Sequence, residues 1–173
     1  EICRHMSSPT VGAMKKLKRL GRYLAGNGRL TTKYEWQGEE SEVTGFSDSD
    51  WAGCRVTGKS TSGGVIMVGS HVIKGWSRTQ NNVTLSSAEA EYVTACLAAQ
   101  EVQWIRQLLA EIGVPISKDP TTVYSDSQSA MHMVNNPTAG RAKHTDIKYH
   151  FVKEAKDRGV VSFRFIPSSG EAA

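Results

Sequence analysis

Cysteine is scarce in this chain. Cys3, Cys54 and Cys96 are far apart, odd in number and form no Cys-x-x-Cys pair. This pattern argues against a disulfide framework and a zinc site, and it favours a reducing compartment. Long apolar runs are lacking too: none approaches the ~20 residues of a membrane span, and the first residues do not resemble a signal peptide. We therefore expect an intracellular protein without a membrane span.

The sequence also lacks internal repeats and low-complexity tracts, and its 173 residues suffice for one full domain and a fragment of another. Its net charge of +4 is unevenly distributed. Residues 1–33 carry eight Lys/Arg against one Glu, a net +7, whereas residues 34–173 carry 13 Lys/Arg against 16 Asp/Glu, a net −3. A basic arm of this kind suits a polyanionic partner, although a solvated helix face fits the charge equally well.

The basic arm has the pattern of a helix. Ser8-Pro9 is typical of an N-cap followed by the first helical residue, and the glycines at 26 and 28 predict its end. Its basic residues lie off an expected apolar stripe of Val11, Met14, Leu17, Leu20 and Leu24. Residues 34–42 are polar and acidic. We therefore expect a helical arm over residues 1–40 and a second domain over residues 41–173.

Strand patterns begin after this boundary. Residues 43–50 alternate with a period of two, which places Phe46, Asp48 and Asp50 on one side of a strand. Short strands at 65–68 and 71–73 flank Gly69-Ser70, a pair typical of a type II′ hairpin. Trp76 is expected to close this hairpin, with residues 77–82 as a polar connection.

The longest predicted helix covers residues 87–112 and is stopped by Gly113 and Pro115. Ser86 and Glu89 form a capping box at its start, which gives Glu89 a structural role. Glu91 instead shares the apolar stripe of Ala95, Ala98, Val102, Ile105 and Leu109. A carboxylate on the core side of a helix is costly unless it is paired or bound to a metal.

The last third of the chain alternates between strand and helix. We expect a strand at 121–126, a helix at 127–135, a basic loop at 139–144, a helix at 147–158 and a strand at 160–166. The resulting order is β-β-β-α-β-α-α-β. It predicts an α/β fold in which helices pack on a mixed five-stranded sheet.

Two aspartates stand at the ends of predicted strands, Asp48 on the first and Asp126 on the fourth. If these strands are neighbours beneath the long helix, both carboxylates meet Glu91 at the carboxyl ends of the strands, where ligands bind in open α/β sheets. Converging carboxylates need a cation, and oxygen ligands select Mg²⁺ or Mn²⁺. Taken singly, Asp48 or Asp50 also fits a loop role and Asp126 a helix N-cap. Their joint placement favours a metal site.

Several segments together have a specific resemblance. They are FSDSDWAG (46–53), KSTSG (59–63), LSSAEAEY (85–92), VYSDS (123–127) and KHTDIKYHF (143–151). In this order they closely resemble the ribonuclease H domain of Ty1/copia-type retrotransposon polyproteins, from about residue 43 to the end. Residues 6–26 are similar, more loosely, to the segment that ends the reverse transcriptase in the same polyproteins.

The resemblance implies a ribonuclease H-like fold and endonucleolytic hydrolysis of the RNA strand of RNA–DNA hybrids during reverse transcription. It implies that Asp48, Glu91 and Asp126 form the catalytic set and hold two Mg²⁺ ions, with Mn²⁺ as a substitute. Tyr92, where related enzymes have an apolar residue, supports Glu91 over Glu89. The implied partners are the hybrid and the reverse transcriptase domain of the same polyprotein, with no membrane and no small-molecule cofactor. The implied location is the cytoplasm, within virus-like particles, or the nucleus.

The family has a fourth carboxylate in an Ala-Asp pair that opens a helix after the final strand. The sequence ends at Ala173, and we expect it to stop just before that residue, so that the fragment binds metal but cleaves poorly. Asp146 and His144 are accessory candidates, with a structural role favoured for Asp146. A zinc pair of His144 and His150 is disfavoured because no cysteine is near. Candidates for nucleic-acid contacts, each equally compatible with simple solvation, are Arg78, Gln80, Asn81, Ser87, Arg141, Lys143 and His144.

Two alternatives are weighed against this function. The first is a DNA nuclease of the integrase or resolvase type, which the hairpin lead-in and the arm argue against. The second is a degenerate, non-catalytic domain that binds hybrid or connects other domains. The complete Asp/Glu/Asp set disfavours the second alternative, and the expected lack of a fourth carboxylate keeps it open.

Overall fold

The computed structural model describes residues 5–29, 31–38, 42–135 and 143–167, except for the side chains from 143 to 149. The chain divides into two compact units, Glu1–Glu35 and Trp36–Ala173. The functional division into an arm and a second domain stays a prediction. In the described part of the chain, no helix has the length and apolar character needed to cross a membrane.

The α-helix described in the first unit is α1 (Val11–Gly26). Its N-cap is Thr10, whose hydroxyl accepts a hydrogen bond from the Ala13 amide at 3.1 Å. The predicted cap at Ser8 was therefore wrong, because the Thr10 hydroxyl already satisfies a free amide of the first turn. The predicted end at Gly26 is confirmed.

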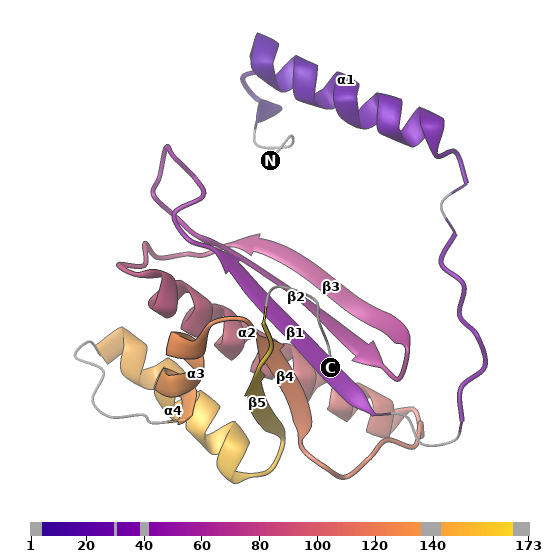
Figure 1. Ribbon diagram of the computed structural model, residues 1–173, viewed down its shortest axis with the longest axis vertical. Helices are drawn as coiled ribbons and strands as arrows, with labels where there is room; N and C mark the ends of the chain where they lie inside the picture. The colour runs from indigo at the N-terminus through magenta and orange to yellow at the C-terminus, as the bar shows by residue number, and fades with distance from the viewer. Residues whose placement is uncertain (1–4, 30, 39–41, 136–142, 168–173) are drawn as a thin grey trace. The chain divides into compact units, whose positions relative to one another are not determined.

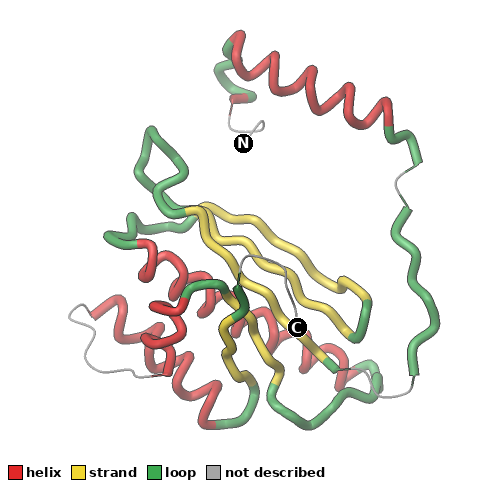
Figure 2. The backbone as a smooth tube through the Cα atoms, in the orientation of Figure 1, coloured by secondary structure: helices red, strands yellow, loops and turns green. Residues whose placement is uncertain are grey.

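The second unit is built on a five-stranded sheet with the strand order β3-β2-β1-β4-β5, drawn in yellow in Figure 2. β1 pairs antiparallel with β2 and parallel with β4, β2 pairs antiparallel with β3, and β4 pairs parallel with β5. The predicted mixed sheet is confirmed, and the first and fourth strands are neighbours, which is the condition on which the expected meeting of the carboxylates depended. The strand bounds are Val43–Asp50 (β1), Thr61–Val68 (β2), His71–Thr79 (β3), Thr121–Ser125 (β4) and Val161–Phe165 (β5).

The β2–β3 hairpin is longer than the sequence predicts. Its two-residue turn joins Val68 to His71, and Gly69 adopts a φ of 56°, as the predicted turn requires. The strands also continue through the small and polar residues 61–64 and 77–79, which pair with each other and, on the other side of β2, with β1. Those residues lack the apolar alternation that identifies a strand, but backbone pairing does not need it.

The long helix α2 (Ser87–Glu111) begins at the predicted capping box. The Ser86 hydroxyl accepts from the Glu89 amide at 3.1 Å, while the Glu89 carboxylate accepts from the Leu85 amide at 2.7 Å instead of the predicted Ser86 amide. At the other end Gly113 has a φ of 75°, and the Val114 amide donates to the Leu109 carbonyl at 2.9 Å. This is the left-handed termination that a glycine permits.

Two shorter helices complete the second unit, α3 (Gln128–Asn135) and α4 (Lys143–Asp157). The predicted basic loop at 139–144 was wrong in its last two residues, because α4 begins at Lys143 and its sequence contains no glycine or proline that would delay it. Residues 139–142, including Arg141, lie outside the described residues.

One hydrophobic core joins these elements. The predicted stripe of α2 is buried from Ala95 to Leu109 and packs with apolar residues of β1, β2, β4, β5, α3 and α4. Figure 1 shows α2 running along the sheet. Gly45 lies where α2 crosses β1: a Cβ there would stand 3.1 Å from a Val123 methyl and 3.6 Å from a Val102 methyl. Nearer the start of α2, Ser49 at the end of β1 donates hydrogen bonds to Glu91, so the first turns of α2 lie beside the end of β1.

Candidate active site

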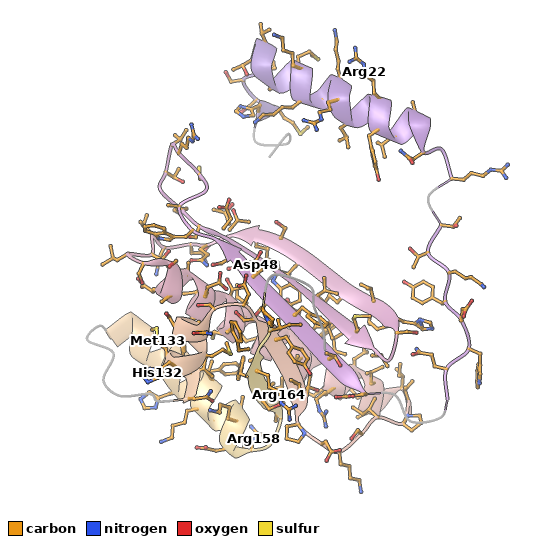
Figure 3. The ribbon with its side chains drawn as sticks, in the orientation of Figure 1. Arg22, Asp48, His132, Met133, Arg158 and Arg164 are labelled. Carbon is orange, nitrogen blue, oxygen red and sulfur yellow. The ribbon has the colours of Figure 1, made fainter. Side chains whose placement is uncertain are left out.

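Three carboxylates from three elements meet at one edge of the sheet. Asp48 is near the carboxyl end of β1, Asp126 follows the last residue of β4, and Glu91 is the fifth residue of α2. β1 and β4 are parallel neighbours, so both strands end at the same edge. One carboxylate oxygen from each residue lies within 4.8 Å of the others. Figure 3 labels Asp48 on β1.

Glu91 is the buried member of this cluster, with only 7% of its surface exposed. Its Oε1 accepts two hydrogen bonds from Ser49, from the amide at 3.0 Å and from the hydroxyl at 2.7 Å. Its Oε2 is buried and has no hydrogen-bond partner among the described residues. Burial raises the pKa of Glu91, the Ser49 hydrogen bonds oppose that rise, and the charges of Asp48 and Asp126 add to it.

The cluster fits a divalent cation. Glu91 Oε2 is a buried acceptor that lacks a donor, and the other two ligands are exposed carboxylates. Oxygens on opposite sides of one Mg²⁺ stand roughly 4.2 Å apart, twice a metal–oxygen bond of about 2.1 Å. A spread of 4.8 Å therefore closes on a cation through small side-chain rotations. A cation would also offset the repulsion among the three carboxylates.

The structural alternatives for the aspartates are resolved locally. The Ser127 hydroxyl accepts from the Ala130 amide at 3.1 Å and occupies the position at the start of α3 that Asp126 was considered for. The Asp50 carboxylate lies against Gly53, where a Cβ would stand 1.8 Å from its oxygen. Asp50 therefore belongs to the turn after β1, and Asp48 belongs to the cluster.

Ser49, which donates two hydrogen bonds to Glu91, was not among the residues predicted for the site. The alternation that put Asp48 on one side of β1 puts Ser49 on the other, towards α2. This signal was present in the sequence. The acceptor of the Ser49 hydrogen bonds became known only from the structure, which puts Glu91 beside the strand.

A second group of missed residues ties the loop after β1 to the start of α2. The Ser60 hydroxyl accepts from the Ala52 amide at 3.1 Å and bonds the Thr84 hydroxyl at 2.8 Å. The Trp51 indole donates to the Thr84 carbonyl at 3.2 Å. Ala52 has a φ of 52°, a strained conformation that these contacts hold in place.

The residues predicted to contact nucleic acid differ in their exposure. Gln80 was wrong: its side chain is buried, and its amide donates to the Ser62 hydroxyl at 2.9 Å and the Ala90 carbonyl at 3.0 Å, so it braces β2 against α2. Arg78 is exposed and ion-paired with Glu101 at 3.4 Å. Asn81 and Ser87 are exposed.

Three further candidates, Lys143, His144 and Asp146, lie in α4, but their side chains are outside the described set. Arg141 lies outside the described residues altogether. A cleft of about 400 Å³ adjoins the predicted contacts, and Arg78, Asn81 and Asn82 are among the residues that line it.

The chain matches no protein-family model. It is 35% identical over 163 residues to the retrovirus-related Pol polyprotein from transposon RE1 of Arabidopsis thaliana, a match that covers 92% of this chain and 11% of the polyprotein. This chain is a relative of copia-type retrotransposon Pol polyproteins. The polyprotein from transposon TNT 1-94 of Nicotiana tabacum is 31% identical over 157 residues, covering 90% of the chain and 12% of the polyprotein. The chain thus spans only about a tenth of the length of these Pol relatives.

Solved structures identify the fold of this Pol relative. LC11-RNase H1, solved in complex with an RNA/DNA hybrid, superimposes with a TM-score of 0.55 at 16% identity, covering 76% of this chain and 89% of that one. The protease-reverse transcriptase of prototype foamy virus gives 0.54 at 13% identity, covering 82% of this chain and 19% of that one. The predicted ribonuclease H-like fold is confirmed.

Proposed function

We propose that this chain hydrolyses the RNA strand of RNA–DNA hybrids by an endonucleolytic, two-metal mechanism. The observation that carries the proposal is the cluster of Asp48, Glu91 and Asp126 within 4.8 Å, in which Glu91 Oε2 is buried without a partner among the described residues. The ribonuclease H fold and the Pol relatives support it. One structural neighbour was itself solved with an RNA/DNA hybrid.

The three carboxylates have distinct roles in this proposal. Asp48 would help to hold both of two Mg²⁺ ions, Glu91 and Asp126 would each help to hold one, and Mn²⁺ would substitute for Mg²⁺. When bound, such a pair of ions supplies a hydroxide for in-line attack and stabilises the leaving 3′ oxygen. Ser49 fixes Glu91 through Oε1 and leaves Oε2 for this purpose.

Substrate choice follows from the sugar. In this proposal Glu91 meets a 2′-hydroxyl near the scissile phosphate. Contact with 2′-hydroxyls across the wide minor groove distinguishes RNA from DNA without reading sequence. Arg78, Asn81, Ser87 and Lys143 contribute phosphate or sugar contacts, so affinity falls as the salt concentration rises. We propose that the chain acts beside the reverse transcriptase domain of the same polyprotein, in the cytoplasm within virus-like particles.

The decisive experiment is cleavage of an end-labelled RNA–DNA hybrid with Mg²⁺, with Mn²⁺ and with EDTA. It compares this chain with a version extended by ~20 residues of its parent gene, enough for a helix of several turns. We expect metal-dependent cuts within the RNA strand that are lost in Asp48→Asn. The matched control is Asp50→Asn, which removes the same charge two residues away and outside the cluster, and it retains cleavage.

Two outcomes contradict the proposal. If the extended chain leaves the hybrid intact but binds it, the non-catalytic connection domain is correct. If the chain cuts duplex DNA as well as hybrid, the function is that of a DNA nuclease.

A further inference from the structure

The basic residues of α1 are gathered on one face of the helix. Lys15, Lys18, Arg19 and Arg22 follow one another at i, i+3, i+4 and i+7, the spacing that places side chains on one side of a helix with 3.6 residues per turn. All four are exposed, and Figure 3 labels Arg22. The helix itself contains no acidic residue.

The opposite face of α1 is apolar. The residues on that face are Ala13, Leu17, Leu20 and Leu24. Lys16 lies outside the basic face, because successive residues of an α-helix point in directions about 100° apart and Lys16 follows Lys15 directly. Val11, which the sequence analysis placed in the apolar stripe, lies on the basic side and is 77% exposed. The apolar face of α1 is therefore shorter than the sequence pattern predicted, because Val11 lies beside the basic residues.

The four like charges of the basic face repel one another when no partner is bound. Lys15 and Arg19, and likewise Lys18 and Arg22, are like charges at i and i+4, which destabilises a helix. Among the described residues none of the four has an acidic partner. A partner that carries several negative charges relieves this repulsion.

The geometry of the face suits a phosphate backbone. From Lys15 to Arg22 the helix advances about 10 Å, and a nucleic-acid duplex carries one phosphate for roughly each 1.7 Å of its axis. Four cations thus meet enough phosphates to be neutralised over that length. The guanidinium groups of Arg19 and Arg22 can each bind one phosphate through two N–H donors.

The helix accompanies the ribonuclease H-like unit in a relative. The match to the RE1 polyprotein covers 92% of the 173 residues, which leaves about 14 unmatched. Even if all of these were at the N-terminus, the match would include α1 from Lys15 onward. In that relative, the segment that matches α1 from Lys15 onward therefore belongs to the same polypeptide as the segment that matches the second unit.

We propose that the basic face of α1, formed by Lys15, Lys18, Arg19 and Arg22, binds the phosphate backbone of the RNA–DNA hybrid. The choice of a nucleic acid over an anionic lipid surface rests on the proposed function. This contact is independent of sequence and of divalent metal. It adds affinity to that supplied by the second unit and takes no part in the chemical step.

The test measures binding of the full chain to a short fluorescent hybrid in EDTA, so that no cleavage occurs. Anisotropy titrations between about 50 and 200 mM KCl give the association constant at each salt concentration. The slope of its logarithm against the logarithm of the KCl concentration changes by roughly 0.9 for each phosphate that the protein neutralises. We expect the slope to shrink by about 3.6 when all four residues are changed to glutamine, with the helix content verified by circular dichroism. The matched pair is Lys18→Gln, whose slope shrinks by about 0.9, and Lys16→Gln, whose slope is unchanged.

An unchanged slope in the fourfold variant overturns the proposal. So does an equal decrease in Lys16→Gln and Lys18→Gln, which would indicate a diffuse charge effect. If the fourfold variant loses binding to phosphatidylserine vesicles but not to hybrid, the basic face serves a membrane surface instead.

Cleavage assays separate this inference from the proposed function. Where the chain is active, the fourfold variant raises KM and leaves kcat unchanged. Asp48→Asn abolishes cleavage but leaves the salt slope of metal-free binding intact. If the chain cleaves hybrid but the fourfold variant has an unaltered salt slope, only the role of α1 is contradicted. If the chain binds hybrid through α1 but does not cleave it, only the proposed function is contradicted.

Discussion

Ser49 donates two hydrogen bonds to a single oxygen of Glu91, from its amide at 3.0 Å and from its hydroxyl at 2.7 Å. The second oxygen of Glu91 is buried and has no partner among the described residues. The two oxygens of one carboxylate are thus differentiated: one is held by β1, and the other is available within the cluster of Asp48 and Asp126.

Replacement of Ser49 by alanine tests this arrangement. Ser49→Ala removes the hydroxyl donor but keeps the amide donor, so Glu91 is held less firmly. Removal of a group that orients a metal ligand typically costs 10- to 100-fold in metal affinity or activity, and we expect about 10-fold in the Mg²⁺ concentration that gives half-maximal cleavage. Ser49→Thr restores the hydroxyl and the affinity. Ser47→Ala, on the same strand, is the control. If Ser49→Ala and Ser47→Ala need the same Mg²⁺ concentration for half-maximal cleavage, Ser49 does not position Glu91.

The raised pKa of Glu91 predicts a pH dependence of stability. Burial, together with the charges of Asp48 and Asp126, lifts this pKa above its ordinary value near 4.5. Between that value and the raised one, the unfolded chain releases a proton that the folded chain keeps. The free energy of unfolding contributed by Glu91 therefore falls as the pH rises through this window, and it is constant above the folded pKa.

Glu91→Gln removes this dependence, because glutamine does not titrate. In EDTA the variant should gain stability relative to the original chain as the pH rises through the window, and the difference should then level off. Urea unfolding from about pH 4 to 8 measures it. If the difference in free energy of unfolding between the two chains does not vary with pH, or shrinks as the pH rises, ionisation of Glu91 does not destabilise the folded chain.

A divalent cation should stabilise the folded chain. A ligand that binds only the folded state at 100 times its Kd adds about 2.7 kcal/mol to the free energy of unfolding. We expect Mg²⁺ or Mn²⁺ to raise the Tm and EDTA to reverse the rise. Asp48→Asn and Asp126→Asn should reduce the effect, while Asp50→Asn should keep it. An identical rise in all of these variants would place the cation elsewhere.

The hairpin depends on a glycine next to Trp76. A Cβ at Gly64 would stand 2.2 Å from the Trp76 ring and 2.8 Å from the Phe46 carbonyl oxygen, so Gly64→Ala should destabilise the chain by about 1–3 kcal/mol. Gly75→Ala is the matched control, because its nearest neighbour is a carbonyl oxygen at 3.8 Å. Its effect should stay within about 0.5 kcal/mol in urea unfolding. Equal effects of the two substitutions would contradict the packing of Trp76 over Gly64.

Local patterns were enough to predict much of this protein. Period-two alternation defined β1 and the side that carries Asp48, and the Ser86 cap with the α2 stripe showed that Glu91 belongs on the core side. These features depend on residues within one or two turns of each other. The element order along the chain was likewise sufficient to predict the mixed sheet, whereas the pairing of the first strand with the fourth was only a condition of the metal-site hypothesis.

Tertiary contacts account for the rest. Gln80 looks like an exposed polar residue of a connection, yet it is buried because β2 and α2 surround it with three acceptors, Ser62, Ala90 and Thr94. The hairpin is longer than its apolar residues, because ladder pairing extends it. The order of residues along the chain already indicates which three carboxylates stand at the ends of core elements. Their approach to within 4.8 Å, and the bonding of Ser49 to one oxygen of Glu91, follow only from the folded arrangement, because both depend on contacts between residues far apart along the chain.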